Sequence, residues 1–295
     1  MISLTPSQKD SILSGPAGGI VGAVRTAAMA GFDKIISFDM GGTTAKITII
    51  ENKKAIKARE FEVDRKARFK KGSGYPLRIP VIEMVEIGAG GGSIARVNKL
   101  EQIITGPDSA GSFPGPACYS NGGSMPTITD ADLVIGKINP DNFAGGKIKL
   151  SKQLADIAIT ENIVKFVNID TNIAALAISE IVDETMSNAA RVHTVEQGHE
   201  TSNRTLIAFG GAAPLHIARV AEKLRVSNII IPTNASVGSA VGFLKAPVGY
   251  EVVKSLRMLL NRFETDKVND LLEKINFYLN LYLTFLEILF YQDFS

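Results

Sequence analysis

Apolar residues recur along this chain at two different spacings. In segments 34–39 and 45–50 they form short β-rich runs, joined by a glycine pair and two threonines. This arrangement predicts a β-hairpin. In segment 170–195 they recur at helical spacing, and Asp170 or Thr171 stands where an N-cap belongs. The pattern therefore predicts one long helix there.

The later part of the chain alternates short apolar runs with helical patterns. Segment 204–209 is typical of a buried strand, segment 226–231 predicts another strand, and helices are predicted over 214–224 and 236–244. Gly210 and Gly211 separate the first of these strands from its helix. Strand, glycine turn, helix, strand and helix in this order indicate an α/β layer structure.

Glycine and proline are concentrated in one stretch. Residues 72–126 hold eleven of the 27 glycines and six of the 12 prolines, which predicts tight turns and long ordered loops. The glycine ribbon in 86–93 lacks the G-x-G-x-x-G spacing and is followed by a strand pattern, so we exclude a dinucleotide site. The ribbon could bind an anion or shape a substrate pocket. Glu86 is either a metal ligand, a base or a surface carboxylate.

The end of the chain differs in composition. Residues 277–295 hold seven of the 20 aromatic side chains, and 275–291 is apolar almost all round. The apolar stretch is slightly short for a bilayer span and contains a charge and two amides. A buried helix is one alternative. The abrupt change of composition favours another, a truncated or shifted reading frame.

Composition and charge narrow the function classes. Lys and Arg total 32 and Asp and Glu total 30, which excludes a chain dominated by polyanion binding. Segment 51–71 alternates basic and acidic residues like an exposed face rather than a nucleic-acid site. The single cysteine, Cys118, excludes an intramolecular disulfide and a multi-cysteine zinc site, and it fits a cytoplasmic location. We expect a buried thiol there rather than a nucleophile, because no histidine is near it in sequence.

Asp39 and the turn after it form the sharpest candidate site. The aspartate ends a predicted strand and is followed by Gly41, Gly42, Thr43 and Thr44. A carboxylate in this place can hold Mg²⁺ directly or through water. The glycine amides can approach phosphate oxygens, and the threonine hydroxyls can donate to the same oxygens. An ordinary hairpin turn is the alternative.

The second candidate is the turn Gly210–Gly211–Ala212, where a strand ends and a helix begins. Phosphate or a nucleoside can lie against bare backbone at such a junction, and the two glycine turns can face each other across a cleft. His216, just inside the helix, is expected to pack or cap rather than to catalyse. Thr127 is a predicted N-cap, and Asp130 and Asp132 after it are expected to act as caps.

Seven short motifs occur in one order along the chain. They are SGPAGGIVGA (14–23), FDMGGTTAK (38–46), EIGAGGGSIAR (86–96), GPDSAGSFPGPACY (106–119), PTITDADLV (126–134), FGGAAPLH (209–216) and VGSAVGFLKAP (237–247). Together they resemble the hydantoinase A/5-oxoprolinase family, which also includes acetone carboxylase subunits. The resemblance implies an actin-like, RNase-H-like α/β ATPase domain over 1–260 with a glycine-rich β insertion at about 72–126. A helical tail over 261–295 follows.

The resemblance also implies a function and a set of site residues. It assigns the second phosphate motif to Asp39, Gly41, Gly42, Thr43 and Thr44, and the adenosine motif to Gly210, Gly211 and Ala212. ATP with Mg²⁺ is expected to activate a carbonyl oxygen before a cyclic amide opens, and carboxylation of a ketone is the alternative. Asp39 and Thr43 are the expected catalytic residues, with Asp39 on the metal. A hydantoinase B-type second subunit and an oligomer are expected partners, whereas nucleic acid and membrane are not.

Two departures from the family pattern modify this expectation. Family members usually begin with a further domain that carries its own D-x-G-G-T motif, and only one such motif is present here. The chain is therefore expected to be a fragment of an ATPase, or else a non-catalytic remnant or assembly partner. In addition, Lys46 stands where many relatives have aspartate.

Overall fold

The computed structural model describes residues 14–58, 61–63, 72–77, 81–246, 252 and 254–292. The chain divides into two compact units, Met1–Ala246 and Pro247–Ser295. The first unit contains all the candidate site residues, so the account of the site concerns this unit alone.

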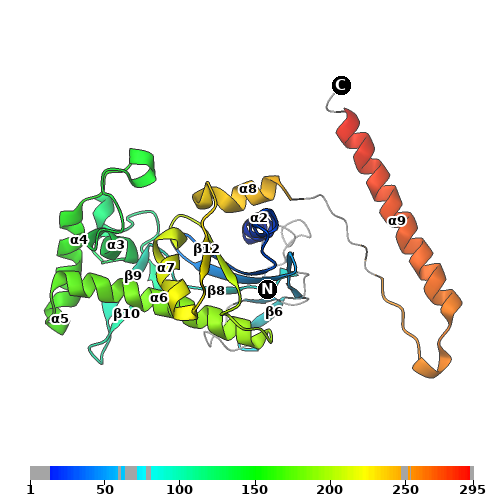
Figure 1. Cartoon of the computed structure of the whole chain (residues 1–295), viewed down its shortest axis with the longest axis horizontal. Coiled ribbons are helices and arrows are strands. Elements are labelled where there is room, and N and C mark those ends of the chain that lie inside the picture. The colour runs from blue at the N-terminus through cyan, green and yellow to red at the C-terminus, as the bar shows by residue number, and fades with distance from the viewer. Residues whose placement is uncertain are drawn as a thin grey trace. The chain divides into compact units, whose positions relative to one another are not determined.

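A six-stranded mixed sheet is the centre of the first unit (Figure 1). Its strands run in the order β12-β11-β1-β2-β3, and β8 also pairs with β2. The pairing is parallel along β12, β11 and β1, and antiparallel along β1, β2, β3 and β8. The bounds are β1 Lys34–Met40, β2 Ala45–Glu51, β3 Lys54–Ala55, β8 Val85–Ile87, β11 Thr205–Phe209 and β12 Asn228–Ile230.

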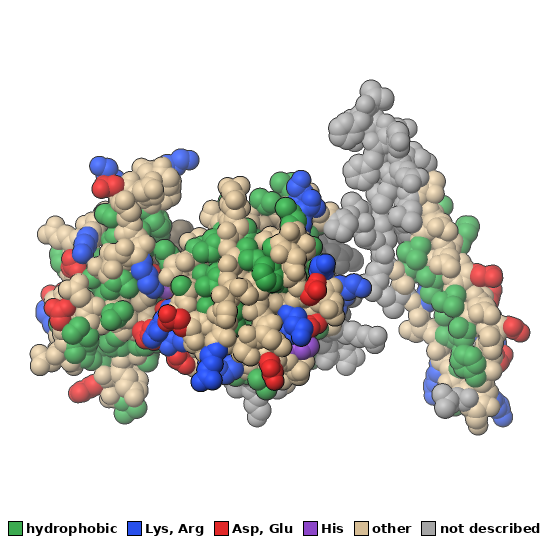
Figure 2. Space-filling model, viewed as in Figure 1, with side chains coloured by type: hydrophobic (Ala, Val, Ile, Leu, Met, Phe, Trp, Pro, Cys, Tyr) green, Lys and Arg blue, Asp and Glu red, His purple; other side chains and the backbone are tan. Residues whose placement is uncertain are grey.

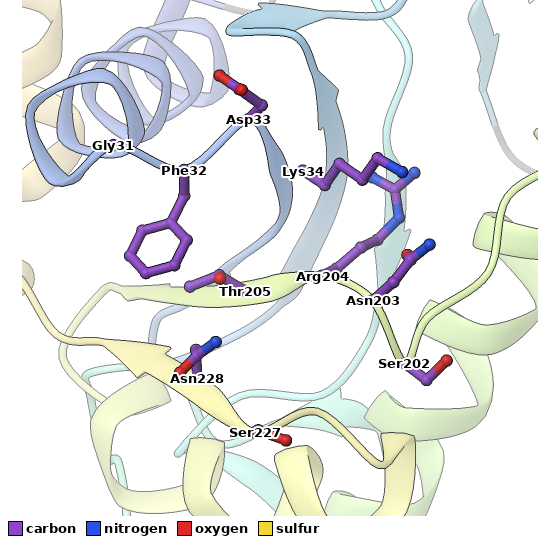
Figure 3. A pocket seen from close by; sticks show the side chains of 10 residues that line it. All are labelled: Gly31, Phe32, Asp33, Lys34, Ser202, Asn203, Arg204, Thr205, Ser227 and Asn228. Atoms are coloured by element: carbon purple, nitrogen blue, oxygen red, sulfur yellow. The ribbon is translucent and has the colours of Figure 1, made fainter.

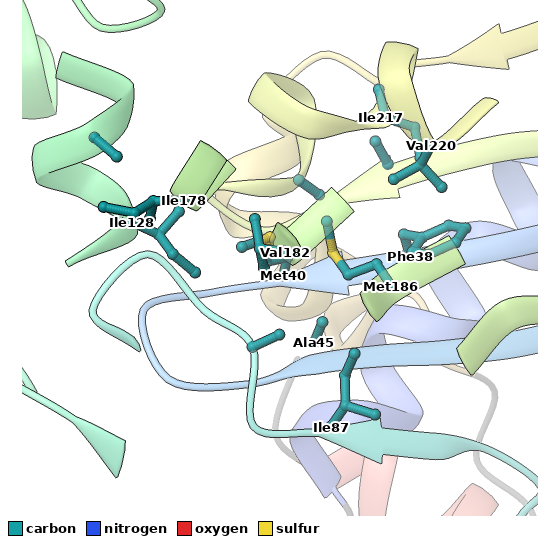
Figure 4. Packing of buried hydrophobic residues seen from close by; sticks show 14 of the residues in the cluster. Phe38, Met40, Ala45, Ile87, Ile128, Ile178, Val182, Met186, Ile217 and Val220 are labelled. Atoms are coloured by element: carbon teal, nitrogen blue, oxygen red, sulfur yellow. The ribbon is translucent and has the colours of Figure 1, made fainter. Parts of the chain in front are cut away.

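Helices cover both faces of this sheet. One face packs against α6 and α7, with α3 packed against α6, and the other packs against α2, which in turn contacts α8. Successive side chains of β1 point to opposite faces. Phe38 and Met40 therefore join the larger core with Val182 of α6 and Val220 of α7 (Figure 4), whereas Ile35 joins the smaller core. The helix bounds are α2 Ser14–Ala30, α3 Ile128–Val134, α6 Thr171–Glu196, α7 Ala213–Leu224 and α8 Gly238–Leu244.

The glycine-rich stretch and the segment before it form short strand pairs beside the main sheet. β4 pairs with β7, β5 with β6, and β9 with β10. Part of the predicted exposed segment 51–71 is strand, and its residues 59–60 and 64–71 lie outside the described ranges. The bounds are β4 Lys57–Ala58, β5 Phe61–Val63, β6 Tyr75–Leu77, β7 Val81–Ile82, β9 Ser93–Val97 and β10 Ile103–Ser109. The helices that follow are α4 Lys152–Ile159, a π turn Thr160–Val164 and α5 Lys165–Val167.

The elements predicted from hydrophobic spacing are confirmed, with small shifts of their ends. Asp170 caps α6, because its side chain accepts a hydrogen bond from the amide of Asn172. Thr127 caps α3 in a reciprocal capping box with Asp130. The last predicted helix begins as a 3-10 turn, Ala235–Val237, and becomes α-helical only at Gly238. Hydrogen bonds from capping side chains thus fix where α6 and α3 begin.

Charges on the surface of the first unit are mixed in sign. Figure 2 shows acidic and basic side chains interspersed on the visible face rather than gathered by sign. Arg219 donates to Glu180 at 2.9 Å, and Lys223 donates to Glu184 at 2.7 Å. Side chains of opposite charge therefore pair with one another in this part of the surface.

The second unit contains one long helix, α9 (Thr265–Gln292), after a 3-10 turn at Leu260–Arg262. The apolar segment 275–291 lies within this helix. Large side chains such as Leu272, Phe277 and Leu281 are exposed along it. Within the described ranges, none of the helices combines the length and the apolar character that a bilayer span requires.

Candidate nucleotide site

The predicted phosphate turn is a tight connection between β1 and β2. The amide of Gly41 donates to the carbonyl of Thr44 at 3.2 Å and closes the turn. Gly42 and Thr43 at its tip are exposed to solvent. The turn therefore presents backbone and a hydroxyl at the end of a buried strand, where a phosphate group could reach them.

The Asp39 carboxylate lies between two glycines. A Cβ on Gly210 would stand 2.8 Å from its Oδ1, and a Cβ on Gly19 of α2 would stand 3.1 Å from its Oδ2. Burial raises the pKa of Asp39, and the positive charge of Lys46 opposes the increase. The carboxylate is thus partly desolvated and has backbone rather than side chains on two sides.

The second glycine turn lies directly beside the first. Gly210 has a φ of +82°, and a Cβ there would collide with the carbonyl oxygen of Met40, so only glycine fits. The amide of Ala212 donates to the same Met40 oxygen at 3.0 Å. Because β1 and β11 are parallel neighbours, their carboxyl ends meet at one edge of the sheet. The fold therefore brings the two predicted turns together.

Two amides of the second turn are already used inside the protein. Gly210 donates to the carbonyl of Ala235 at 2.8 Å, and Ala212 donates to Met40. Gly211 between them is exposed, and nothing lies within 4 Å of the place where its Cβ would stand. Among the three residues predicted to bind a nucleoside, Gly211 is the open position, and Gly210 and Ala212 hold the turn in shape.

The glycine ribbon in 86–93 packs against the phosphate turn and forms backbone hydrogen bonds with it. The amides of Gly91 and Gly92 donate to the carbonyls of Gly41 and Gly42 at 3.0 and 2.7 Å. A Cβ on Gly90 would collide with the amide nitrogen of Thr43. These amides bind protein carbonyls, which argues against an anion on the ribbon. The ribbon is glycine-rich because two backbones approach each other closely here.

The start of α3 anchors this ribbon. The amide and the hydroxyl of Thr129 both donate to the carbonyl of Gly91 at 2.8 Å. The Asp130 carboxylate acts as a cap, as predicted, and also accepts from the amide of Cys118 at 2.7 Å. Cys118 is fully buried, and this burial raises the pKa of its thiol. It is the buried thiol that the sequence predicts, and such a thiol stays protonated and unreactive.

A buried charge cluster lies behind the second turn. The Nδ1 of His216 is 2.8 Å from Asp183 Oδ1, and its Nε2 is 3.1 Å from Asp132 Oδ2. Lys137 Nζ lies 3.6 Å from Asp132 and 3.9 Å from Asp183, and it donates to Ser179. Burial lowers the pKa of His216, but its contacts with the two carboxylates outweigh this and raise it to about 9. His216 is therefore an imidazolium at neutral pH.

Sequence reasoning missed this cluster in part. It placed His216 as a packed residue, which is confirmed, but it expected Asp132 to be only a cap. Asp132 is 1% exposed and pairs with His216 instead. The signal that could have found the cluster is the helical spacing itself, which places Asp183 on the same buried face of α6 as Ser179 and Met186.

A polar cavity of about 420 Å³ lies at the opposite ends of the same strands (Figure 3). Arg204 in its wall is bound to Glu51 at 2.6 Å and is 4% exposed, so its charge is already paired. Ligands of open α/β sheets bind at the carboxyl ends of the strands. We therefore place the candidate site at Asp39 rather than in this cavity. The other lining residues are Gly31, Phe32, Asp33, Lys34, Ser202, Asn203, Thr205, Ser227 and Asn228.

The donor set at the carboxyl edge suits Mg²⁺ better than a metal held by protein alone. Within the described ranges, no group of three or more His, Cys, Asp or Glu side chains is placed to hold a metal ion. Mg²⁺ in nucleotide sites takes one or two carboxylates, and phosphates and waters supply its other ligands. One carboxylate beside a turn with threonine hydroxyls fits that pattern, so Asp39 is the residue that would hold the ion.

The mixed sheet with helices on both faces confirms the α/β fold that the motifs predict. The chain belongs to the hydantoinase/oxoprolinase family, whose model matches residues 2–252. Its fold is shared by the nucleotide-free acetone carboxylase structure, with a TM-score of 0.71 and 30% identity. That match covers 82% of this chain and 33% of the acetone carboxylase chain.

Relatives with named activities fall into two groups. The caprolactamase subunit alpha of Pseudomonas jessenii is 32% identical over 90% of this chain and 37% of its own length. The acetophenone carboxylase gamma subunit of Aromatoleum aromaticum is 33% identical over 89% of this chain and 35% of its own length. The chain thus spans little more than a third of these relatives.

Proposed function

We propose that this chain is the nucleotide-binding part of an ATP-dependent hydrolase subunit that opens a cyclic amide of the hydantoin or 5-oxoproline type. The observation that carries the proposal is the meeting of two glycine turns and Asp39 at the carboxyl ends of β1 and β11. Backbone and hydroxyl donors beside a carboxylate suit a phosphate chain with its metal ion.

Each residue of the site has a distinct role in this proposal. Asp39 holds Mg²⁺ directly or through water, and the exposed backbone of Gly42 and the hydroxyls of Thr43 and Thr44 donate to phosphate oxygens. The open surface at Gly211 takes the nucleoside. Mg²⁺ supplies charge compensation for the phosphate oxygens when it is bound.

The reaction follows from the poor reactivity of an amide carbonyl. The carbonyl oxygen attacks the γ-phosphorus of ATP, and ADP leaves. Water then adds to the activated carbon and the ring C–N bond breaks, with the ring nitrogen taking up a proton, which leaves an acyl phosphate. A second water hydrolyses this acyl phosphate to the acid and free phosphate. The net reaction consumes ATP and two waters and yields ADP, phosphate and an open-chain amino or ureido acid. Donors placed on the transferred phosphoryl group lower the barrier to the first step.

A ketone carboxylase subunit is the second candidate function, and the likeness to the acetophenone carboxylase gamma subunit favours it. In that reaction bicarbonate takes the place of the amide as phosphoryl acceptor. In either case the chain would act with a second subunit of the hydantoinase B type. A non-catalytic assembly role is the remaining alternative.

Calorimetry on the purified chain tests nucleotide binding directly. We expect MgATP to bind with micromolar affinity, and Asp39→Asn to weaken this binding about tenfold, as loss of one charged ligand does. Asp33→Asn is a matched control, because Asp33 stands exposed before the other end of β1. A folded wild-type chain that binds no MgATP would refute the nucleotide function.

Substrate-dependent turnover separates the enzymatic alternatives. The chain is combined with its second subunit and ATP hydrolysis is followed. Stimulation by a hydantoin or by 5-oxoproline supports the hydrolase. Stimulation only by bicarbonate with a ketone supports the carboxylase. MgATP binding without turnover under either condition supports the assembly role.

A further inference from the structure

Three charged residues form a row across the sheet beside the phosphate turn. In the strand register, Asp39 of β1 is directly opposite Lys46 of β2, and Lys46 is directly opposite Glu86 of β8. Residues opposite each other on antiparallel strands place their side chains on the same face, about 5 Å apart. One cation therefore stands between two carboxylates on the face that carries Asp39.

Lys46 reaches from this row to the phosphate turn. Its Nζ donates to the hydroxyl oxygen of Thr44 at 2.9 Å and lies 3.3 Å from Glu86 Oε1. A threonine hydroxyl can accept and donate at once. The hydroxyl of Thr44 thus keeps its own hydrogen for a further acceptor, such as a phosphate oxygen.

The ion pair between Lys46 and Glu86 is exposed to solvent. A contribution to the stability of the fold therefore does not explain why these two residues are paired. The Glu86 side chain is 39% exposed and that of Lys46 is 23% exposed. Ion pairs in contact with water contribute little to folding. A lysine ammonium on its flexible stem is a movable point charge, and the several negative charges of a nucleotide would attract it more strongly than one hydrated carboxylate.

We propose that Lys46 is a ligand of the nucleotide phosphate chain and that Glu86 and Thr44 hold its ammonium beside the turn before the nucleotide binds. The inference rests on the proposed nucleotide function and adds to it the cation that the phosphate turn itself lacks. Gly41, Gly42, Thr43 and Thr44 bring no positive charge, and Lys46 is the lysine that the register places next to them.

The test compares MgATP, MgADP and adenosine binding to the whole chain by calorimetry. Lys46→Gln is expected to weaken MgATP binding at least tenfold and to change adenosine binding less than twofold. Lys46→Arg keeps the charge and is expected to stay within about threefold of the wild type. Lys53→Gln is the matched control, because Lys53 pairs with Asp33 at the other end of the same hairpin. It should leave all three affinities unchanged.

A further variant examines Glu86. If Glu86 only holds Lys46, Glu86→Gln should not weaken MgATP binding, since the ammonium is then released to the phosphates. A tenfold loss with Glu86→Gln would contradict the holding role.

The outcomes separate this inference from the proposed function. Wild-type binding with an unchanged Lys46→Gln variant overturns the role of Lys46 alone. Equal loss of MgATP, MgADP and adenosine affinity in Lys46→Gln means that Lys46 only maintains the shape of the pocket, which also overturns it. A folded wild-type chain that binds no nucleotide overturns the proposed function together with this inference.

Discussion

Replacing His216 by glutamine tests the buried charge cluster quantitatively. The pKa of His216 rises from its usual 6.5 to about 9 in the folded chain, because its contacts with Asp132 and Asp183 outweigh the effect of burial. At about 1.4 kcal/mol per pH unit, this difference is worth roughly 3 kcal/mol of unfolding free energy. This contribution is a large part of the unfolding free energy of an ordinary domain.

The direction of the pH dependence follows from the same shift. The folded-state pKa lies above the unfolded-state pKa, so the folded chain binds the extra proton. The contribution is fully present below about pH 6.5 and is lost as the pH rises through about 9. In the wild type, the unfolding free energy should therefore fall by roughly 3 kcal/mol over this window.

Urea unfolding at several pH values between 6 and 9.5 measures the effect. Far-UV circular dichroism is the suitable signal, because the chain contains no tryptophan. His216→Gln leaves two carboxylates without their imidazolium, so it should be less stable by about 3–5 kcal/mol near pH 6. The difference from the wild type should shrink as the pH rises. His199→Gln, which changes a histidine outside the cluster, should keep the wild-type slope.

Two results would refute this reasoning. One is a constant stability difference between the wild type and His216→Gln across the pH window. The other is an imidazole that titrates below pH 7. The chain has only three histidines, so NMR can assign the signal of His216 by its loss in the variant.

Three other predictions follow from the described contacts. Gly210→Ala should lower the unfolding free energy by about 1–3 kcal/mol, because Gly210 has a positive φ and a Cβ there would collide with Met40. Gly211→Ala should lower it much less, because the space around Gly211 is open. Urea titration of both variants measures the difference. The Cys118 thiol should react with a thiol reagent only at the rate of unfolding, since it is buried and its pKa is raised; fast labelling of the native chain would contradict its burial. Thr127→Ala should lower the unfolding free energy by about 1 kcal/mol through loss of the α3 cap, and an unchanged melting curve would show that the cap contributes nothing.

The sequence by itself determined the elements and both glycine turns. The hairpin of β1 and β2 follows from two β-rich runs around a glycine pair, and the caps Thr127 and Asp170 mark where α3 and α6 begin. These features depend on residues within a few positions of one another. Local backbone preferences and hydrogen bonds are therefore enough to specify them.

Only the tertiary structure decided which residues meet. His216, Asp132 and Asp183 come from three different helices, and their meeting depends on how α3 and α7 pack against α6. Sequence spacing alone placed Asp132 as a cap, because it contains no information about the packing of distant helices.

The phosphate turn also combines residues that the sequence shows with contacts that only the fold makes. Its glycines and threonines are visible in the sequence, but Gly91 and Gly92 support it only because the ribbon folds back onto it. Likewise, Lys46 is set between Asp39 and Glu86 by the register of three strands. A shift of one residue would turn every side chain of a strand to the other face. Contacts between distant segments therefore depend on strand register and helix packing, which only the folded chain determines.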